Sequence, residues 1–266
     1  MSKFFTTEIS NPRNEFDGLR WITVKSPALK KRADISIYVP NEPKEQPLDA
    51  VILLHGVYGS HWAWTMNGSV HKTANRLIAE RKMKPMVLIM PSDGLFGDGS
   101  GYLKHKDEDY ENWIVDDVIT VIKEQIEVVN DNSNFFISGL SMGGYGALRL
   151  GAKHPNTFRS FSGLSSITDF PQLSQFLEKE DFEKLSNVAL KKESVLECIL
   201  NNKSHILPFH FDCGTDDILI ELNRELHQSL LENKIEHSYK EHSGSHQWDY
   251  WQKHIEDSLL FFDGLS

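Results

Sequence analysis

The chain has 266 residues, of which 39% are hydrophobic and 11% aromatic, which is enough to build one sizeable core and excludes a disordered chain. Its 38 acidic and 28 basic residues give a net charge of −10, which argues against a nucleic acid or an anionic membrane as the main partner. At this length, one α/β domain over residues 1–266 is the favoured organisation.

The sequence also indicates the compartment. No stretch approaches the ~20 apolar residues that a membrane span needs. The first residues lack the apolar segment of a signal peptide, so we expect a cytoplasmic protein without a membrane partner. Cys198 and Cys213 are the only cysteines, which excludes a disulfide framework and any Cys-x-x-Cys metal spacing. The sequence leaves a homo-oligomer open.

The expected strands change character along the chain. Trp21–Val24 and Ile35–Val39 come first and are typical of edge strands, the second because polar and apolar residues alternate along it. Later strands are continuously apolar, which is typical of strands that helices cover on both faces. These later strands are expected at Val51–Leu54, Met86–Met90, Phe135–Ile137 and Leu207–Phe211, and a further strand, which is not continuously apolar, is expected at Ile235–Tyr239.

Helical patterns lie between these strands. The clearest is Asn112–Asn130, whose apolar residues form one stripe. Strand–helix alternation predicts an α/β fold with a mostly parallel central sheet and helices on both faces. Functional sites in such sheets form at the carboxyl ends of the strands. The other expected helices are His71–Glu80, Ala147–Lys153, Leu219–Leu231 and Trp248–Phe262.

Residues 167–203 interrupt the alternation. This segment is charged and mildly amphipathic, and it lies between two expected strands. One interpretation is a small helical cap inserted over the carboxyl edge of the sheet, and the other is a solvated surface insertion.

Ser141 is the candidate nucleophile. It is the central residue of Gly139-Leu140-Ser141-Met142-Gly143, which follows the strand Phe135–Ile137 and precedes a helical pattern. A nucleophilic serine at a sharp strand-to-helix turn has a strained backbone, so the residues two positions away must lack bulk. The N-terminus of the following helix directs N–H groups at the reacting centre.

A serine nucleophile needs a histidine base and a carboxylate that orients it, in the chain order serine, acid, histidine. Three carboxylates follow the strand Leu207–Phe211, and of these Asp212 can still lie in the strand. Asp217, three residues after Gly214, is better placed to return over the end of the sheet than Asp216, so Asp217 is favoured. The residue that does not serve as the acid is expected to cap the next helix.

His246 is the favoured base. It lies in a loop of small residues between the strand Ile235–Tyr239 and the last helix, which lets its imidazole reach over the strand ends. His242, four residues earlier, is the alternative. His227 and His254 lie inside helical patterns.

The oxyanion hole requires backbone N–H donors aimed at the developing negative charge. Met142, directly after the nucleophile, is expected to supply one. Val57 is expected to supply the second, since it follows the buried strand Val51–Leu54 and the dipeptide His55-Gly56. His55 precedes the serine in the chain, so we interpret it as a hydrogen-bonding residue that organises this loop.

Four segments carry a family resemblance. The chain resembles the putative esterase family of α/β-hydrolases over roughly residues 20–262, in LLHGVYGSHWAW, GLSMGGYGAL, CGTDDIL and GSHQWDYW. That family includes tributyrin esterases, S-formylglutathione hydrolases, feruloyl and acetylxylan esterases and mycolyltransferases. The resemblance implies the α/β-hydrolase fold and cofactor-free hydrolysis of carboxylic esters, with Ser141, Asp217 and His246 as the triad and with Val57 and Met142 as oxyanion donors.

The resemblance leaves the substrate open. Short-chain acyl esters are expected, including acetyl or feruloyl esters of carbohydrates. The alternatives are a thioesterase similar to S-formylglutathione hydrolase, or an acyltransferase with the same triad. Formylglutathione hydrolases typically carry Ser-Gly-Leu-Thr-Cys at the position of the His55-Gly56 loop, and this chain lacks it. A binding module on an inactive scaffold would need a missing triad member, and candidates for all three are present.

No metal site is expected from the sequence. Asp93, Asp98 and Ser100 lie in a glycine-rich segment, but their spacing departs from the helix–loop–helix calcium pattern and no glutamate closes it.

Overall fold

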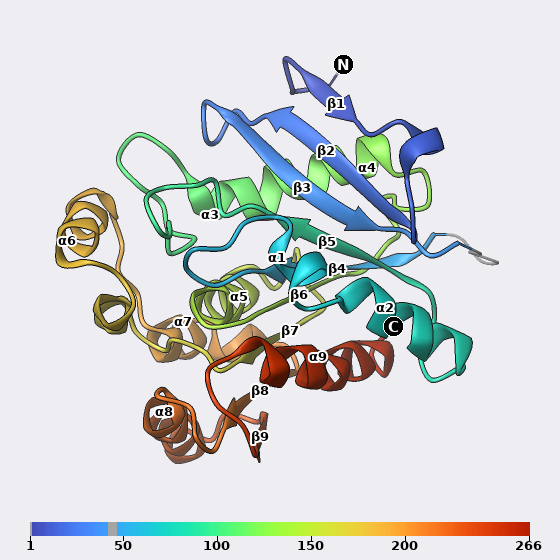
Figure 1. Ribbon diagram of the computed structural model, residues 1–266. Coiled ribbons are helices and arrows are strands. Elements are labelled where there is room, and N and C mark those ends of the chain that lie inside the picture. The colour runs from blue at the N-terminus through green and yellow to red at the C-terminus, as the bar shows by residue number, and fades with distance from the viewer. Residues whose placement is uncertain (1, 42–46) are drawn as a thin grey trace.

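The structure, a computed structural model, describes residues 2–41 and 47–266, and in these residues one nine-stranded sheet forms the centre (Figure 1). The strands are β1 (Thr7–Ile9), β2 (Leu19–Lys25), β3 (Arg32–Tyr38), β4 (Asp49–Leu54), β5 (Met86–Pro91), β6 (Phe135–Gly139), β7 (Ser160–Leu164), β8 (Phe209–Gly214) and β9 (Ser238–His242). Their order is β1-β2-β3-β5-β4-β6-β7-β8-β9. In this order, the three pairs β1–β2, β2–β3 and β3–β5 are antiparallel. All the following pairs, from β5–β4 to β8–β9, are parallel, which confirms the mostly parallel sheet.

Helices cover both faces of this sheet, as predicted (Figure 1). The α-helices are α1 (Ala63–Met66), α2 (Val70–Ala79), α3 (Tyr110–Asn112), α4 (Ile119–Gln125), α5 (Met142–Lys153), α6 (Lys179–Val188), α7 (Val195–Asn201), α8 (Ile220–Glu232) and α9 (Trp248–Asp263). Apolar residues of α2 and α9 pack on one face, and those of α4, α5, α7 and α8 pack on the other. None of the helices in the described residues combines the length and apolar character needed to cross a bilayer.

Strand β4 illustrates why both faces are apolar. Val51 and Leu53 belong to the core under α2 and α9, whereas Ile52 and Leu54 belong to the core on the opposite face. Successive side chains of a strand point to opposite faces, so a strand covered on both sides favours apolar residues at successive positions. The continuous apolar pattern therefore identified β4, β5 and β6 correctly.

Several expected boundaries are wrong. The helix expected over Asn112–Asn130 is instead α3, a π-helical segment at Trp113–Val118 and α4, which ends at Gln125. The π-helical segment contains the buried Asp117, whose carboxylate accepts hydrogen bonds from the Ser26 hydroxyl and the Ala28 N–H. A single amphipathic stripe does not encode such an inward-facing carboxylate.

Other differences concern the strands. β7 was not expected, because its sequence SFSGL is short and half polar. The structure also extends β8 to Gly214, so Asp212 lies inside the strand, and it ends β9 at His242 instead of Tyr239. His242 is therefore fixed in a strand, whereas His246 lies in the loop that follows.

Residues 167–203 form a short 3-10 helix at Phe170–Gln175, then α6 and α7. Their apolar side chains, among them Leu185 and Ile199, join the core on the α5 face. A capping box at Ser194, in which Ser194 and Glu197 bond each other's backbone N–H, fixes the start of α7.

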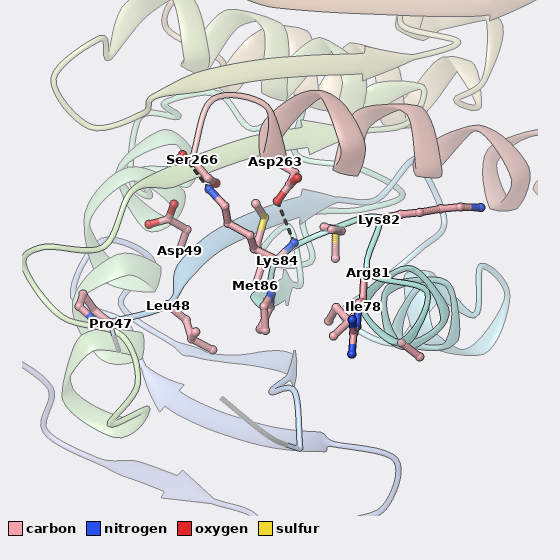
Figure 2. A pocket seen from close by; sticks show the side chains of 13 residues that line it. Pro47, Leu48, Asp49, Ile78, Arg81, Lys82, Lys84, Met86, Asp263 and Ser266 are labelled. Atoms are coloured by element: carbon pink, nitrogen blue, oxygen red, sulfur yellow. Dashed lines mark hydrogen bonds between the residues drawn. The ribbon is translucent and has the colours of Figure 1, made fainter. Parts of the chain in front are cut away.

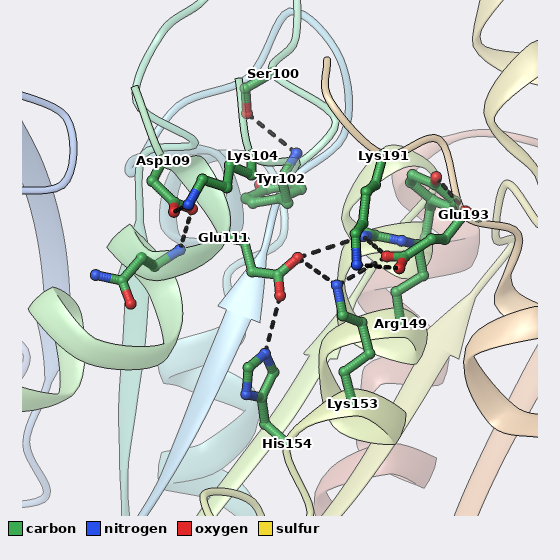
Figure 3. Close-up of polar contacts among 12 residues, drawn as sticks. Ser100, Tyr102, Lys104, Asp109, Glu111, Arg149, Lys153, His154, Lys191 and Glu193 are labelled. Atoms are coloured by element: carbon green, nitrogen blue, oxygen red, sulfur yellow. Dashed lines mark hydrogen bonds and ion pairs between the residues drawn. The ribbon is translucent and has the colours of Figure 1, made fainter. Parts of the chain in front are cut away.

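An ion-pair network holds the middle and end of α5 (Figure 3). Arg149 is fully buried and contacts Glu111 at 3.4 Å and Glu193 at 3.1 Å, and Lys153 contacts the same two carboxylates at 2.8 Å. Burial alone would raise the pKa of Glu111, but hydrogen bonds from His154 and Lys153 lower it to about 2. The network joins α5 to α3 and to Glu193, two residues before α7, and thereby fixes the helix that follows Ser141.

Candidate active site

Ser141 lies at the turn between β6 and α5 with φ 54° and ψ −117°. Few residues other than glycine adopt a positive φ, so this backbone is strained. A Cβ atom at Gly139 would lie 2.3 Å from the Gly143 carbonyl oxygen, and one at Gly143 would lie 2.3 Å from the Leu54 carbonyl oxygen. The requirement for small residues on both sides of the serine therefore holds in the structure.

The structure brings Ser141, His246 and Asp217 into one hydrogen-bonded chain. Nε2 of His246 lies 3.0 Å from Ser141 Oγ, and Nδ1 lies 3.0 Å from each carboxylate oxygen of Asp217. Because a carboxylate can only accept, Nδ1 carries the proton and Nε2 accepts the Ser141 hydroxyl. The Asp217 side chain is fully buried, while 16% of the His246 side chain is exposed toward solvent.

Two glycines place the acid and the histidine. A Cβ at Gly214 would lie 2.3 Å from the Gly244 carbonyl oxygen, so the two loops can meet only through their backbones. That same carbonyl accepts the Asp216 N–H at 2.9 Å. Asp217 closes a turn onto the Gly214 carbonyl at 3.1 Å, and its Oδ1 accepts the Leu219 N–H at 2.8 Å.

The other aspartates have different surroundings. The side chain of Asp216 is exposed, and α8 begins at Ile220, so Asp216 does not cap that helix as expected for the residue not used. Asp212 is buried and accepts the Tyr250 hydroxyl at 2.6 Å. Burial raises the pKa of Asp212 to about 8, so it is largely uncharged at neutral pH.

Both expected oxyanion donors are free to bind a ligand. Among residues 2–41 and 47–266, no acceptor bonds the N–H of Val57 or of Met142. A Cβ at Gly56 would lie 3.4 Å from Ser141 Cβ and 2.9 Å from Leu140 Cδ1, so this glycine lets the loop approach the serine closely.

His55 holds this loop, which confirms its expected role. Nδ1 of His55 donates to the Gly56 carbonyl at 2.7 Å, and Nε2 accepts the Asp93 N–H at 2.9 Å. Burial lowers the pKa of His55, so the ring is neutral and can make both bonds. The Gly56 carbonyl and the Val57 N–H belong to one planar trans peptide and point in opposite directions, so fixing the carbonyl also fixes the N–H.

Two aromatic rings contact the His246 imidazole. Phe176, directly after the 3-10 helix of residues 167–203, lies with its ring centre 5.1 Å from that of His246. Trp251 of α9 meets the imidazole edge-on at 4.9 Å. The hydroxyl of Tyr58, which follows the expected oxyanion donor, donates to the Phe176 carbonyl. Sequence reasoning missed Phe176 because no motif surrounds it.

A groove of about 770 Å³ lies elsewhere, where β4 and β5 begin (Figure 2). Its lining includes Asp49 and Met86, which start these strands, and the basic side chains of Arg81, Lys82 and Lys84. Ser141 follows the carboxyl end of β6, so the groove is at the opposite edge of the sheet and holds none of the residues described above.

Comparisons with known proteins identify the family of this chain. The family described as "Putative esterase" matches residues 26–262. An acetyl esterase of Caldicellulosiruptor saccharolyticus is 26% identical over 271 residues, which cover 92% of this chain and 98% of that protein. An endo-1,4-beta-xylanase/feruloyl esterase of Xylanibacter ruminicola is 25% identical over 58% of this chain and 22% of its own length.

Solved structures share the fold. A ferulic acid esterase aligns over 100% of both chains with a TM-score of 0.82 and 22% identity. An S-formylglutathione hydrolase of Staphylococcus aureus aligns over 96% of this chain and 98% of its own, with a TM-score of 0.77 and 20% identity. Since the family match spans most of the sequence, the chain belongs to the putative esterase family and is a carboxylic ester hydrolase with the α/β-hydrolase fold.

Proposed function

We propose that this protein is a serine esterase that cleaves short-chain acyl esters through an acyl-enzyme intermediate. One observation carries the proposal: the hydrogen-bonded chain from Asp217 through His246 to Ser141 ends beside two unpaired backbone N–H groups. A nucleophile, its base, the group that orients the base and two oxyanion donors are the set that acyl transfer requires.

Acylation uses each of these groups once. Ser141 Oγ attacks the ester carbonyl while His246 Nε2 takes the hydroxyl proton, and Asp217 stabilises the imidazolium that forms. The N–H groups of Val57 and Met142 bind the oxyanion of the tetrahedral intermediate. When that intermediate collapses, the ester C–O bond breaks and His246 returns the proton to the departing alkoxide oxygen.

Deacylation repeats the sequence with water. His246 takes a proton from the water, whose oxygen attacks the acyl carbonyl. Collapse of the second intermediate releases the carboxylic acid, and Ser141 recovers its proton. The fully buried Asp217 suits this double use, because a carboxylate shielded from water keeps its interaction with the imidazolium strong.

We further propose that residues 167–203 act as a cap on the single domain of residues 1–266. The contacts of Phe176 with the His246 ring and with the Tyr58 hydroxyl support this, since both join the segment to groups beside the nucleophile. The acetyl esterase relative supports a small acyl group, and acetyl or feruloyl esters of carbohydrates are the substrates that we propose first.

Loss of the nucleophile tests the proposal. We expect Ser141→Ala to lower kcat for p-nitrophenyl acetate by about 10⁴-fold or more and to abolish labelling by a fluorophosphonate. Ser60→Ala, close to the expected oxyanion loop, is the matched control and keeps both. Full activity of folded Ser141→Ala, with unchanged circular dichroism, would contradict the proposed mechanism.

A substrate panel separates the related activities. Acetylated and feruloylated sugars, triglycerides and S-formylglutathione are compared by kcat/KM, with and without alcohol acceptors. Preferred transfer to an acceptor would identify an acyltransferase, and a marked preference for the thioester would identify a thioesterase.

We also propose a cytoplasmic location and a small-molecule ester as a partner, with neither a nucleic acid nor a membrane. Cys198 and Cys213 are both buried free thiols, which agrees with a reducing compartment. Fractionation of cells that express the tagged full chain tests this, and recovery with an exported fraction would contradict it.

A further inference from the structure

A second group of histidine and aspartate side chains lies on either side of the loop that carries His246. His242 is the last residue of β9, before the loop, whereas His254 and Asp257 lie on α9, after it. His254 and Asp257 are three residues apart and therefore share one face of the helix. In the β8–β9 ladder Gly214 is opposite His242 and Asp212 is opposite Lys240, so His242, Lys240 and Asp212 point to the same face of the sheet.

Three potential ligand atoms converge at this point. His254 Nδ1 lies 3.3 Å from Asp257 Oδ2, and His242 Nε2 lies 3.7 Å from the same oxygen. One donor atom from each of the three residues lies within 4.8 Å of the other two. In a tetrahedral site with bonds of about 2.0–2.2 Å, neighbouring ligand atoms are roughly 3.3–3.6 Å apart. The spacing is therefore close to that of a metal site.

Each imidazole in this group has one buried nitrogen without a hydrogen-bond partner among the described residues, and His254 also shares a hydrogen bond with Asp257 through Nδ1. Nε2 of His242 and Nε2 of His254 are both buried, and neither has a partner in the part of the chain that the structure describes. Only 6% of the His254 side chain is exposed. Buried polar atoms are normally hydrogen-bonded, so these two nitrogens are available to a ligand.

We propose that His242, His254 and Asp257 bind a divalent transition-metal ion of the zinc class, with water as the fourth ligand. Two imidazoles and one carboxylate are a ligand set for such ions, whereas calcium and magnesium prefer oxygen alone. The two imidazole rings are stacked at 4.0 Å and inclined by 15°, so binding turns them about Cβ–Cγ until their lone pairs meet. That torsion is soft in histidine.

Lys240 sets the strength of the site. Its Nζ lies 3.6 Å from Asp257 Oδ1, so it competes with a cation for this carboxylate. About half of the Lys240 side chain is exposed, which lets it move into solvent when the ion binds. Removal of the positive charge is therefore expected to strengthen metal binding, an effect that damage to the fold does not produce.

The proposed ion joins the two ends of the His246 loop. Ligands on β9 and α9 enclose residues 243–247, so a bound ion restrains the loop without touching the reacting atoms. Its role is structural, and the inference stands independently of the proposed ester hydrolysis. The spacing His-x11-His-x2-Asp matches no local zinc pattern, which is why the sequence did not indicate it.

Metal binding is measured on the full chain after removal of metals with a chelator. Calorimetric titration with ZnCl2 is expected to give one site with a micromolar dissociation constant, and Co²⁺ is expected to produce visible absorption typical of a four-coordinate site. Asp257→Asn and His242→Ala weaken zinc binding by about tenfold or more. Lys240→Met tightens it severalfold. Zinc also raises the Tm of the wild type, because it binds only the folded chain.

The control uses another imidazole pair. Nδ1 of His227 lies 2.8 Å from Nε2 of His237, and His237→Ala removes this pair and leaves the proposed site intact. Zinc binding that is unchanged in Asp257→Asn, lost in His237→Ala, or absent from the wild type at about 1 mM zinc would overturn the proposal. If His242→Ala does not fold, the partly exposed positions Asp257 and Lys240 still decide the outcome.

Discussion

Two histidine–aspartate groups lie close together along this chain and differ in how their nitrogens are used. In the first, His246 contacts Asp217 through Nδ1 and Ser141 through Nε2, so both nitrogens have a partner. In the second, His242 and His254 stand near the same oxygen of Asp257. The residue types are the same, and only the first arrangement forms a directional path from a carboxylate to a hydroxyl.

The carboxylates differ as much as the imidazoles. Asp217 is fully buried and also accepts the Leu219 N–H, which fixes its orientation. About a third of the Asp257 side chain is exposed, and a lysine lies next to it. Proton transfer in catalysis needs an oriented, shielded acceptor. Composition alone therefore does not identify a catalytic histidine, whereas the partner of its second nitrogen does.

The largest difference in esterase activity is expected between variants of His246 and His242. His246→Ala removes the base, so kcat for p-nitrophenyl acetate falls by about 10⁴-fold or more. His242→Ala is expected to keep at least a third of wild-type activity in chelator-treated buffer, because His242 contacts no catalytic group. Steady-state kinetics of both purified variants measure the difference, and equal losses in two folded variants would remove the distinction between the groups.

The next largest difference in activity is expected between variants of Asp217, the proposed acid, and Asp216. Asp217→Asn preserves shape but removes the negative charge that fixes the tautomer of His246, and we expect kcat to fall by about 10³–10⁴-fold. Asp216→Asn, one residue earlier and exposed, is expected to stay within about threefold, as is usual for a surface change. A comparable loss in Asp216→Asn would mean that the acid had been assigned to the wrong residue.

The sequence predicted those parts of the site that depend on local backbone geometry. The motif around Ser141 implies a strained turn flanked by glycines, and a Cβ at Gly139 or Gly143 would indeed collide with backbone atoms. Chain order then limited the acid and base to a few residues. The sequence did not resolve Asp217 from Asp216 beyond a preference, because burial depends on how the Gly214 and Gly244 loops meet.

Features that depend on distant contacts were missed. Phe176 reaches His246 from a segment without a motif, and the metal ligands come from two elements with no characteristic spacing. The helix expected from Asn112 was also interrupted, where the buried Asp117 accepts a hydrogen bond from Ser26 in the turn between β2 and β3. The periodicity of apolar residues predicts which face of a helix or strand is buried, but it does not predict which distant residue of the chain packs against that face.

Asp212, another buried carboxylate, is expected to affect the free energy of unfolding instead of catalysis. Burial raises its pKa from 3.8 to about 8, so between these values the unfolded chain loses a proton that the folded chain keeps. Stability therefore falls as pH rises from about 4 to 8. Each pKa unit corresponds to about 1.4 kcal/mol, so the free energy of unfolding falls by at most about 6 kcal/mol. Asp212→Asn cannot ionise and is expected to remove this fall.

The measurement is urea unfolding at several pH values. The difference in free energy of unfolding between Asp212→Asn and the wild type isolates this group from other titrating residues, and we expect it to grow with pH in favour of the variant. A difference that does not change with pH would show that Asp212 is ionised in the folded protein.

The smallest effect on stability is expected at Asp257, whose contribution to the free energy of unfolding is lost as pH falls, opposite to that of Asp212. Burial alone would raise its pKa, but the hydrogen bond with His254 and the nearby charges of Lys240 and His242 lower it overall. Its contribution is therefore present above the pKa of the unfolded chain and is lost as pH falls below about 4. Because the side chain is partly exposed, we expect Asp257→Asn to cost less than about 1 kcal/mol at pH 7 without zinc. Unfolding at pH 7 and pH 3 tests this: the cost should be smaller at pH 3, whereas a large cost that is the same at both pH values would indicate that Asp257 acts through packing instead of charge.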